Sequence, residues 1–175
     1  MPVKSYVLFD CIHKLIVNGH DQHVFSILHL LNLDDKYYYK DAIAVLKKLI
    51  HEGFEKQAYL LYLNFFTDDK QREDKEELHG RFILKPLVLN SEFDVIRSII
   101  CDLKERGELR VISETARIAI TTKKIDLAFQ LLQLMVERGE PVRHHMFYPL
   151  LTIFRKDKDI NNLLHTLRRI PDLAD

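Results

Sequence analysis

The chain of 175 residues has little of what turns, disulfides and membrane spans require. It contains only 5 Gly and 5 Pro, and this shortage of turn residues disfavours sandwiches and barrels with many strands. Its two cysteines, Cys11 and Cys101, are too few for a disulfide scaffold or a cysteine-rich zinc module. No apolar run reaches the roughly 18 residues of a transmembrane helix. The first residues do not have the pattern of a signal peptide either.

Neither charge is in excess, because 26 Lys or Arg balance 26 Asp or Glu. A strongly basic nucleic-acid-binding protein is therefore not visible in the total. The distribution is nevertheless uneven, since residues 109–175 carry 11 Lys or Arg against 8 Asp or Glu. The last third of the chain is thus the part whose charge favours contact with phosphates.

Motifs of known catalytic chemistry are missing as well. The sequence has no glycine-rich phosphate loop of the P-loop or dinucleotide type, and no Gly-x-Ser-x-Gly elbow. His20 and His23 stand three residues apart, but we expect them to serve surface or capping roles rather than to bind a metal. The sequence thus predicts a protein that is not an enzyme and holds no cofactor and no metal.

Helical spacing of apolar residues, by contrast, extends over most of the sequence. Leu8, Cys11, Ile12 and Leu15 form one such stripe, and similar stripes recur toward the C-terminus. No segment shows the sustained alternation that is typical of a strand. Links of a few residues between short helices force neighbouring helices to run antiparallel. The sequence therefore predicts an all-α protein.

Glycines mark the ends of several expected helices. Gly19, Gly53, Gly107 and Gly139 each follow an apolar stripe, where glycine commonly forms a left-handed C-cap. An aspartate stands 12 or 13 residues before three of them, so one helix type would run from Asp to Gly and a second would follow. Helix pairs of roughly 35 residues bury both faces only by stacking, which predicts an α-solenoid of stacked antiparallel helix pairs. A plain antiparallel bundle is the alternative.

The repeat divides the sequence into predicted segments. Residues 1–66 would hold degenerate helical repeats, 67–77 a polar loop without apolar side chains, and 78–108 another degenerate repeat. Residues 109–143 would form one complete unit and 144–175 a truncated one. The number of helices between residues 67 and 90 stays open, because Gly80 and Pro86 interrupt any single long helix there.

Residues 109–143 resemble a pentatricopeptide repeat. In that family a second helix begins with a small residue and ends near Met-x-x-x-Gly, as Ala128 and Met135–Gly139 do here. The next segment, with an aromatic pair before Pro149-Leu150-Leu151 and a charged turn after it, resembles the leucine-rich members of the family in animal mitochondria. This resemblance covers about residues 109–171. It implies a fragment of a longer protein and an α-solenoid like that of the pentatricopeptide repeats.

The resemblance also implies a function. Members of the family bind single-stranded messenger RNA without catalysis, at about one base per repeat. For the leucine-rich members it implies stabilisation of mitochondrial mRNA, with support of its polyadenylation and translation. A small protein with an RNA-recognition motif is an implied partner, and a membrane is not. The implied location is the mitochondrion, with the nucleus as a second location.

Site residues follow from the family pattern, in which the fifth and the last residue of each unit read the bases. The corresponding fifth residues are Ser113 and Tyr148, and the last residue of the complete unit is Arg143. Tyr148 would stack on a base and Arg143 would contact a phosphate. Basic pairs in the expected turns would add phosphate contacts. These pairs are Lys123 with Lys124, and Arg155 with Lys156.

Other interpretations stay open. Zero net charge, and the departure of Arg143 and Tyr148 from the family pattern, favour a protein-binding α-solenoid scaffold. A structural helical domain that self-associates through exposed apolar ends is a further alternative. The run Tyr37-Tyr38-Tyr39 offers rings for base stacking, but we expect it to begin a helix with one or two rings between helices.

Overall fold

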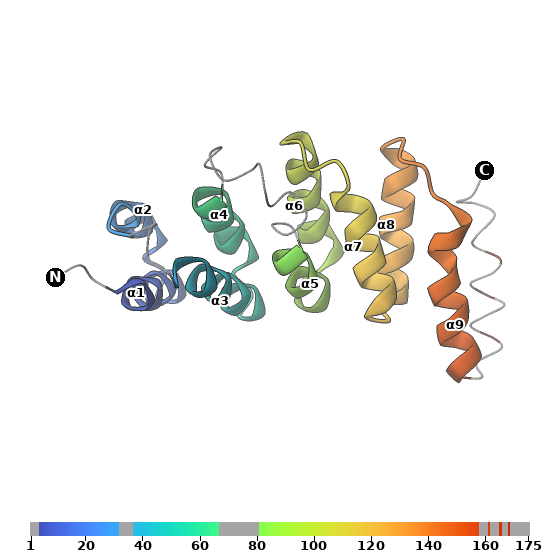
Figure 1. Cartoon of the computed structure of the whole chain (residues 1–175), viewed down its shortest axis with the longest axis horizontal. Helices are drawn as coiled ribbons and strands as arrows, with labels where there is room; N and C mark the ends of the chain where they lie inside the picture. Colours follow the sequence, from blue (N-terminus) through green and yellow to red (C-terminus); the bar gives the residue numbers. More distant parts are fainter. Residues whose placement is uncertain are drawn as a thin grey trace. The chain divides into compact units, whose positions relative to one another are not determined.

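The computed structural model describes residues 4–31, 37–66 and 81–157, together with residues 161, 165 and 168. Regular structure in these ranges is helical throughout, and none of the residues described lies in a strand (Figure 1). The predicted all-α class is therefore confirmed. The chain divides into two compact units, Met1–Ser91 and Glu92–Asp175. The predicted polar loop at residues 67–77 lies outside the described residues.

The N-terminal unit contains one row of helices with a second layer against it. Its elements are α1 (Ser5–Val17), the 3₁₀ turn η1 (Asp21–His23), α2 (Val24–Leu28), α3 (Tyr38–His51), α4 (Glu55–Phe66) and α5 (Arg81–Asn90). In the row, α3 contacts both α1 and α5, while α2 packs on α1 and α4 packs on α3 (Figure 1). Helix pairs that contact mainly their neighbours are the packing of a helical-repeat fold.

The C-terminal unit repeats this plan. Its elements are α6 (Phe93–Glu105), α7 (Val111–Thr121), α8 (Ile125–Glu137), the 3₁₀ turn η3 (His144–Phe147) and α9 (Tyr148–Asp157). α7 packs most extensively on α8, and together they occupy the predicted unit at residues 109–143. α7 also contacts α9, and α6 contacts α8. α7 and α9 therefore form one row, and α6 and α8 form the second layer. We call the helices of the row first helices and those of the second layer second helices, in both units.

Polar contacts between helices that lie one helix pair apart show the length of the repeat. His13 Nε2 lies 2.7 Å from Glu52 Oε2, a contact between residues 39 positions apart. In the C-terminal unit, Lys104 Nζ donates to Glu140 Oε1 over 36 positions. Side chains separated by one helix pair thus meet in both units, as stacking of pairs of roughly 35 residues requires.

Within the described ranges, four helices end in a glycine with positive φ, as the sequence predicts. These are Gly19, Gly53, Gly107 and Gly139. The N–H after each glycine donates to a carbonyl five residues earlier, for example from His20 to Leu15 at 2.8 Å. This motif satisfies carbonyls that have no partner inside the helix. A Cβ at any of the four would meet nothing within 4 Å, so the backbone conformation alone selects glycine.

A fifth helix has the same ending without glycine. Lys123, after α7, has a φ of 61°, and its N–H donates to the carbonyl of Ile120 at 3.1 Å. The N–H of Lys124 then donates to the carbonyl of Ala119 at 2.9 Å. The predicted turn at Lys123 and Lys124 is thus present. Because this cap has no glycine, the sequence did not indicate that Lys123 adopts the left-handed conformation.

Two local expectations differ from the structure. The glycine cap ends first helices such as α3 and second helices such as α8, so it does not mark one helix type. The reason is that a cap depends only on the local backbone. Pro86 lies inside α5 and does not end it. Proline removes one N–H donor, and the helix continues beyond it to Asn90.

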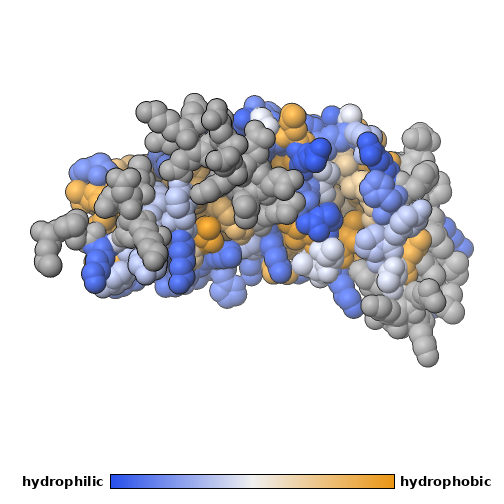
Figure 2. Space-filling view, viewed as in Figure 1, coloured by the Kyte–Doolittle hydropathy of each residue, from blue (hydrophilic) through white to orange (hydrophobic). Residues whose placement is uncertain are grey.

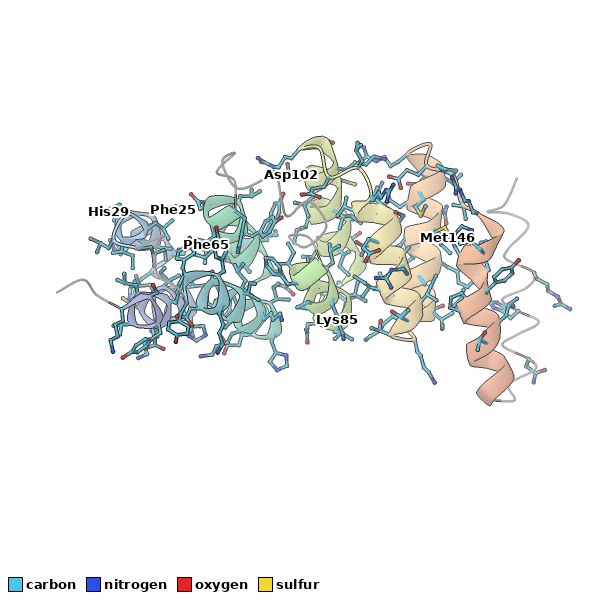
Figure 3. All side chains as sticks on the ribbon, viewed as in Figure 1. Phe25, His29, Phe65, Lys85, Asp102 and Met146 are labelled. Carbon is cyan, nitrogen blue, oxygen red and sulfur yellow. The ribbon has the colours of Figure 1, made fainter. Side chains whose placement is uncertain are left out.

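The two units fill their interiors differently. In the N-terminal unit Phe9 meets Phe65 edge to face at 5.4 Å and Tyr38 at 5.7 Å, which brings α1, α3 and α4 together. Figure 3 labels Phe65. Tyr38 is 2% exposed, and this burial raises the pKa of its phenol to about 12. The expectation that a ring of the tyrosine run lies between helices is confirmed. Between α7 and α8, aliphatic side chains such as Ile112 and Leu131 are fully buried instead.

Candidate nucleic-acid interface

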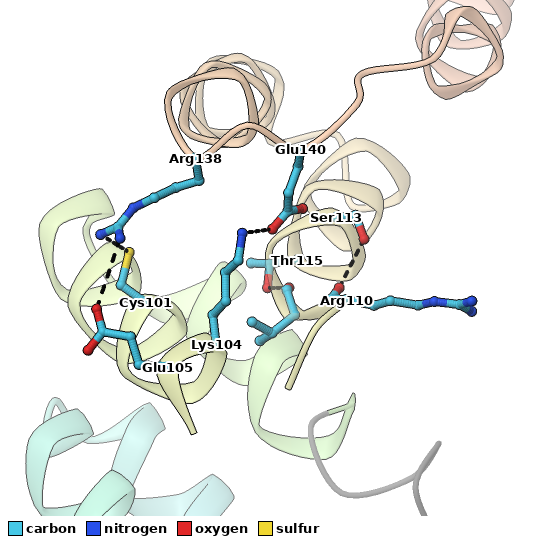
Figure 4. Close-up of polar contacts among 9 residues, drawn as sticks. Cys101, Lys104, Glu105, Arg110, Ser113, Thr115, Arg138 and Glu140 are labelled. Atoms are coloured by element: carbon cyan, nitrogen blue, oxygen red, sulfur yellow. Dashed lines mark hydrogen bonds and ion pairs between the residues drawn. The ribbon is translucent and has the colours of Figure 1, made fainter. Parts of the chain in front are cut away.

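The polar side of α7 is built around Ser113. Ser113 lies in the first turn of the helix and is half-buried, and its Oγ donates to the carbonyl of Arg110 at 2.9 Å (Figure 4). A hydroxyl that donates locally keeps its lone pairs for accepting a hydrogen bond. Ile112 and Ala116, on the same helix, are fully buried in the core. Ser113 is therefore placed to accept a hydrogen bond from a ligand, but its single proton is already engaged.

Arg117 and Glu114 form an ion pair further along the same side of α7. Two hydrogen bonds join the guanidinium to the carboxylate, Nε to Oε2 at 2.9 Å and Nη2 to Oε1 at 2.5 Å. The hydrogen bond to Glu114 raises the pKa of Arg117 above its ordinary value. The pair neutralises the middle of this side, so phosphate contacts are better supplied by its ends.

Arg143 and Tyr148 lie near the start of α9. Tyr148 is its first residue and is 62% exposed, while Arg143 is exposed in the extended link after α8. α7 contacts α9, and the two helices run in the same direction (Figure 1). Ser113 and Tyr148 therefore lie at the same end of two helices in contact. The structure places the three predicted base-reading residues at the N-terminal ends of α7 and α9.

The predicted basic pairs lie at the opposite end. Lys123 and Lys124 follow the C-terminus of α7, and both are exposed. Ten residues separate Ser113 from Lys123, which at 1.5 Å per helical residue is about 15 Å. Arg155 and Lys156 belong to the last turn of α9, so the predicted turn does not begin at Arg155. The predicted site residues therefore form two groups, one at each end of α7 and α9.

Second helices of the C-terminal unit carry cations that are already paired. Lys104 contacts Glu140, and Arg97 Nη2 lies 3.6 Å from Glu137 Oε2. Arg138 Nη2 donates to the Sγ of Cys101 at 3.2 Å, and Arg138 Nη1 approaches Glu105 at 4.0 Å (Figure 4). These pairs join α6 and its loop to the end of α8. They make the side of α7 and α9 the better candidate for contact with an anionic ligand.

Arg110 and Arg117 are the residues that sequence reasoning missed. Arg110 directly precedes α7, Arg117 lies one turn after Ser113 on α7, and both are exposed. The helical spacing of three and four residues around Ser113 was a signal that could have found them.

Neither a cluster of metal-ligating side chains nor a membrane-spanning helix is found in the described ranges. There, no group of three His, Cys, Asp or Glu side chains gathers, although the rings of His20 and His23 lie 6.4 Å apart. Among the helices that the structure describes, none is long and apolar enough to cross a membrane.

Comparison with known proteins extends the resemblance seen in the sequence. The chain is 27% identical over 170 residues to the "Leucine-rich PPR motif-containing protein, mitochondrial" of Xenopus tropicalis, where PPR denotes the pentatricopeptide repeat. The aligned region covers 95% of this chain and 12% of that relative, so the chain spans about an eighth of the relative's length. No family model matches the chain. The similarity thus reaches almost the whole chain, beyond the resemblance at residues 109–171.

Proposed function

We propose that the chain is a non-catalytic helical-repeat protein that binds single-stranded messenger RNA in mitochondria. In this proposal it stabilises the mRNA and supports its polyadenylation and translation, with the nucleus as a second location. Similarity to a mitochondrial PPR-motif protein over 95% of the chain supports it. The observation that carries it is the group of Ser113, Arg143 and Tyr148 at one end of α7 and α9. A small protein with an RNA-recognition motif is proposed as a partner on the family resemblance alone.

Each residue of this group has a distinct role in the proposed contact. The Tyr148 ring, 62% exposed, would stack on one base, a contact worth about 1–3 kcal/mol. Ser113 Oγ would accept a hydrogen bond from a base edge. Arg143 would pair with a phosphate. The pairs Lys123 with Lys124 and Arg155 with Lys156 would hold phosphates at the other end of the helices.

A fluorescence anisotropy titration of the full chain with labelled single-stranded RNA, at several salt concentrations, tests this function. Tyr148→Ala should weaken binding by about 5- to 150-fold, because one stacked base is lost. Arg143→Gln should reduce the salt dependence of log K by about 0.7, the value for one phosphate contact on a single strand. Arg97→Gln is a matched control, because Arg97 already pairs with Glu137. No binding by the wild-type chain at low salt would contradict the proposal.

Protein binding is the second candidate function, and one feature of the N-terminal unit favours it. Phe25 and Leu60, about half exposed, line a hollow of about 200 Å³ together with Ile16 and Val24. Apolar side chains around a concave surface are typical of protein contacts in helical-repeat proteins. A partner that the chain retains after nuclease treatment, together with a negative RNA titration, would favour this function.

A further inference from the structure

A hollow of about 200 Å³ opens between α2 and α4, in the second layer of the N-terminal unit. Its floor is apolar and buried, because the lining residues Ile16, Val24 and Leu61 are at most 3% exposed. Phe25 of α2 (Figure 3) and Leu60 of α4 form its walls, and their side chains are 51% and 49% exposed. Figure 2 shows hydrophobic residues, coloured orange, at the surface where Figure 1 places α2. We call this feature the α2–α4 hollow.

The short length of α2 explains why the hollow is open. α2 has 5 residues, whereas α4, the next second helix of the same unit, has 12. At 1.5 Å per residue, α2 is therefore shorter than α4 by about 10 Å. In the C-terminal unit, α6 and α8 have 13 residues each. Second helices of a helical-repeat fold cover one another's sides, so the short α2 leaves Leu60 of α4 half-exposed.

The size of the hollow indicates what kind of ligand it takes. Pockets for whole small molecules measure roughly 300–1,000 Å³. The α2–α4 hollow is smaller, at about 200 Å³, so it suits one or two large side chains of a partner. Helices that bind in apolar grooves present such side chains at positions i, i+3, i+4 and i+7. A helical segment is therefore the occupant that fits, and it would lie beside α4 where α2 is too short to cover it.

Charge at the rim indicates which helix would bind. Among the described lining residues Asp21 is the only charged one, and its side chain is exposed. None of the ion pairs found among the described residues involves Asp21. Gln22 and Gln57 add two amides to the rim. An anionic ligand would be repelled by this carboxylate, whereas a lysine or arginine of a partner would complement it.

We propose that the α2–α4 hollow binds an amphipathic helix of a partner protein, one that carries large apolar side chains beside a lysine or arginine. The apolar side chains enter between Phe25 and Leu60, and the cation pairs with Asp21. Gln22 and Gln57 form hydrogen bonds with polar groups at the rim. This inference rests on the second candidate function, protein binding, and gives the chemistry of the partner. It does not depend on the proposed binding of RNA.

A selection from a phage-displayed library of helical peptides, on the immobilised full chain, tests the inference. The library varies positions i, i+3, i+4 and i+7 of one helix face and the positions beside them. The enriched peptides should share large apolar residues on that face and a lysine or arginine next to them. Fluorescence anisotropy with a labelled enriched peptide then measures Kd. Phe25→Ser with Leu60→Ser should weaken binding by about 10-fold or more, because the central apolar contact is lost.

Charge exchange at Asp21 tests the second part of the contact. Asp21→Asn should weaken binding by about 2- to 5-fold at low salt and reduce its salt dependence, because an exposed ion pair is weak and screened by salt. Asp21→Lys should weaken binding further. A peptide with glutamate in place of its cation should bind this variant more tightly than it binds the wild type. A purely structural role of Asp21 would not produce this exchange of preference.

Matched controls come from the same unit. Leu89→Ser removes an apolar side chain of α5 that is 44% exposed, and Asp10→Asn removes an exposed carboxylate of α1 that already pairs with Lys14 at 2.7 Å. Neither residue lines the α2–α4 hollow, so both variants should bind the peptide like the wild type. Circular dichroism melts of all variants verify that the fold is kept.

Three results would overturn the inference. One is a selection that enriches no peptide, or only peptides without the apolar and basic pattern. Another is equal binding of the peptide by the wild type and by Phe25→Ser with Leu60→Ser. The third is self-association of the chain alone that this double variant abolishes, because a second copy would then be the occupant. RNA titrations of the double variant should match those of the wild type, so failure of the RNA-binding proposal and failure of this inference are separate results.

Discussion

The N-terminal and C-terminal units have the same plan of helix pairs but different interiors. The aromatic ring contacts found among the described residues lie in the N-terminal unit, where Phe9, Tyr38 and Phe65 form the centre of a cluster. Between α7 and α8 the buried side chains are mostly aliphatic, among them Ile112, Ala116, Ala128 and Leu131, although Phe129 of α8 is buried as well. Apolar volume at the helical period is therefore what the fold requires, and either residue class supplies it.

Removing a buried aromatic ring should give the largest effect, a loss of stability that falls mainly on the N-terminal unit. Phe9→Ala should lower the free energy of unfolding by about 3–5 kcal/mol, because Phe9 is 3% exposed and contacts two rings. Hydrogen exchange should rise mainly in α1, α3 and α4. Phe25→Ala, at a half-exposed ring of the same unit, should cost less than 1 kcal/mol. Equal exchange in α7 and α8 would show that the two units unfold together.

Alkaline pH should weaken the N-terminal unit through Tyr38. Burial raises the pKa of this phenol from 10.0 to about 12, so the folded state favours the neutral form. Its contribution to stability is complete below pH 10 and is lost as the pH rises toward 12. Thermal unfolding followed by circular dichroism across this range should show the loss. Tyr38→Phe, which keeps the ring and removes the titration, should reduce it, and an unchanged pH profile would contradict the assignment.

Substitutions at two helix caps of the C-terminal unit should give the smallest changes in the free energy of unfolding, and the two changes should have opposite signs. Gly107→Ala should lower the free energy of unfolding by about 1 kcal/mol, because φ is 104° there while a Cβ meets no neighbour. Lys123→Gly should raise it by about 0.5–1 kcal/mol, since φ is 61° at that position. Equilibrium urea unfolding measures both variants. Effects of the same sign would show that the backbone conformation does not determine these energies.

Sequence alone predicted the class of fold and the glycine caps, because both depend on local patterns. In the predicted stripe of α1, Leu8 and Ile12 are buried but Cys11 is exposed, which was not expected, and Gly19 has a positive φ. Sequence could not predict the left-handed Lys123, since lysine carries no conformational signal for it. Pro86 was expected to interrupt a helix, but α5 packs on α3 and buries Leu84 and Leu87 on either side of it.

The candidate site was less accessible to sequence reasoning. Family resemblance named Ser113, Arg143 and Tyr148. Only the structure shows that Ser113 Oγ already donates to the carbonyl of Arg110, and that the basic pairs lie at the other ends of α7 and α9.

The left-handed Lys123 after α7 shows that a cap of this repeat can hold a residue other than glycine. Glycine is the most stable residue at a left-handed cap. A lysine in the same conformation makes the cap less stable but adds a positive charge before the next helix. Because a Cβ at each of the four glycine caps would meet nothing within 4 Å, such a cap has room for a side chain without repacking of the neighbouring helices. Caps of this kind are therefore natural places to graft a label or a new binding group.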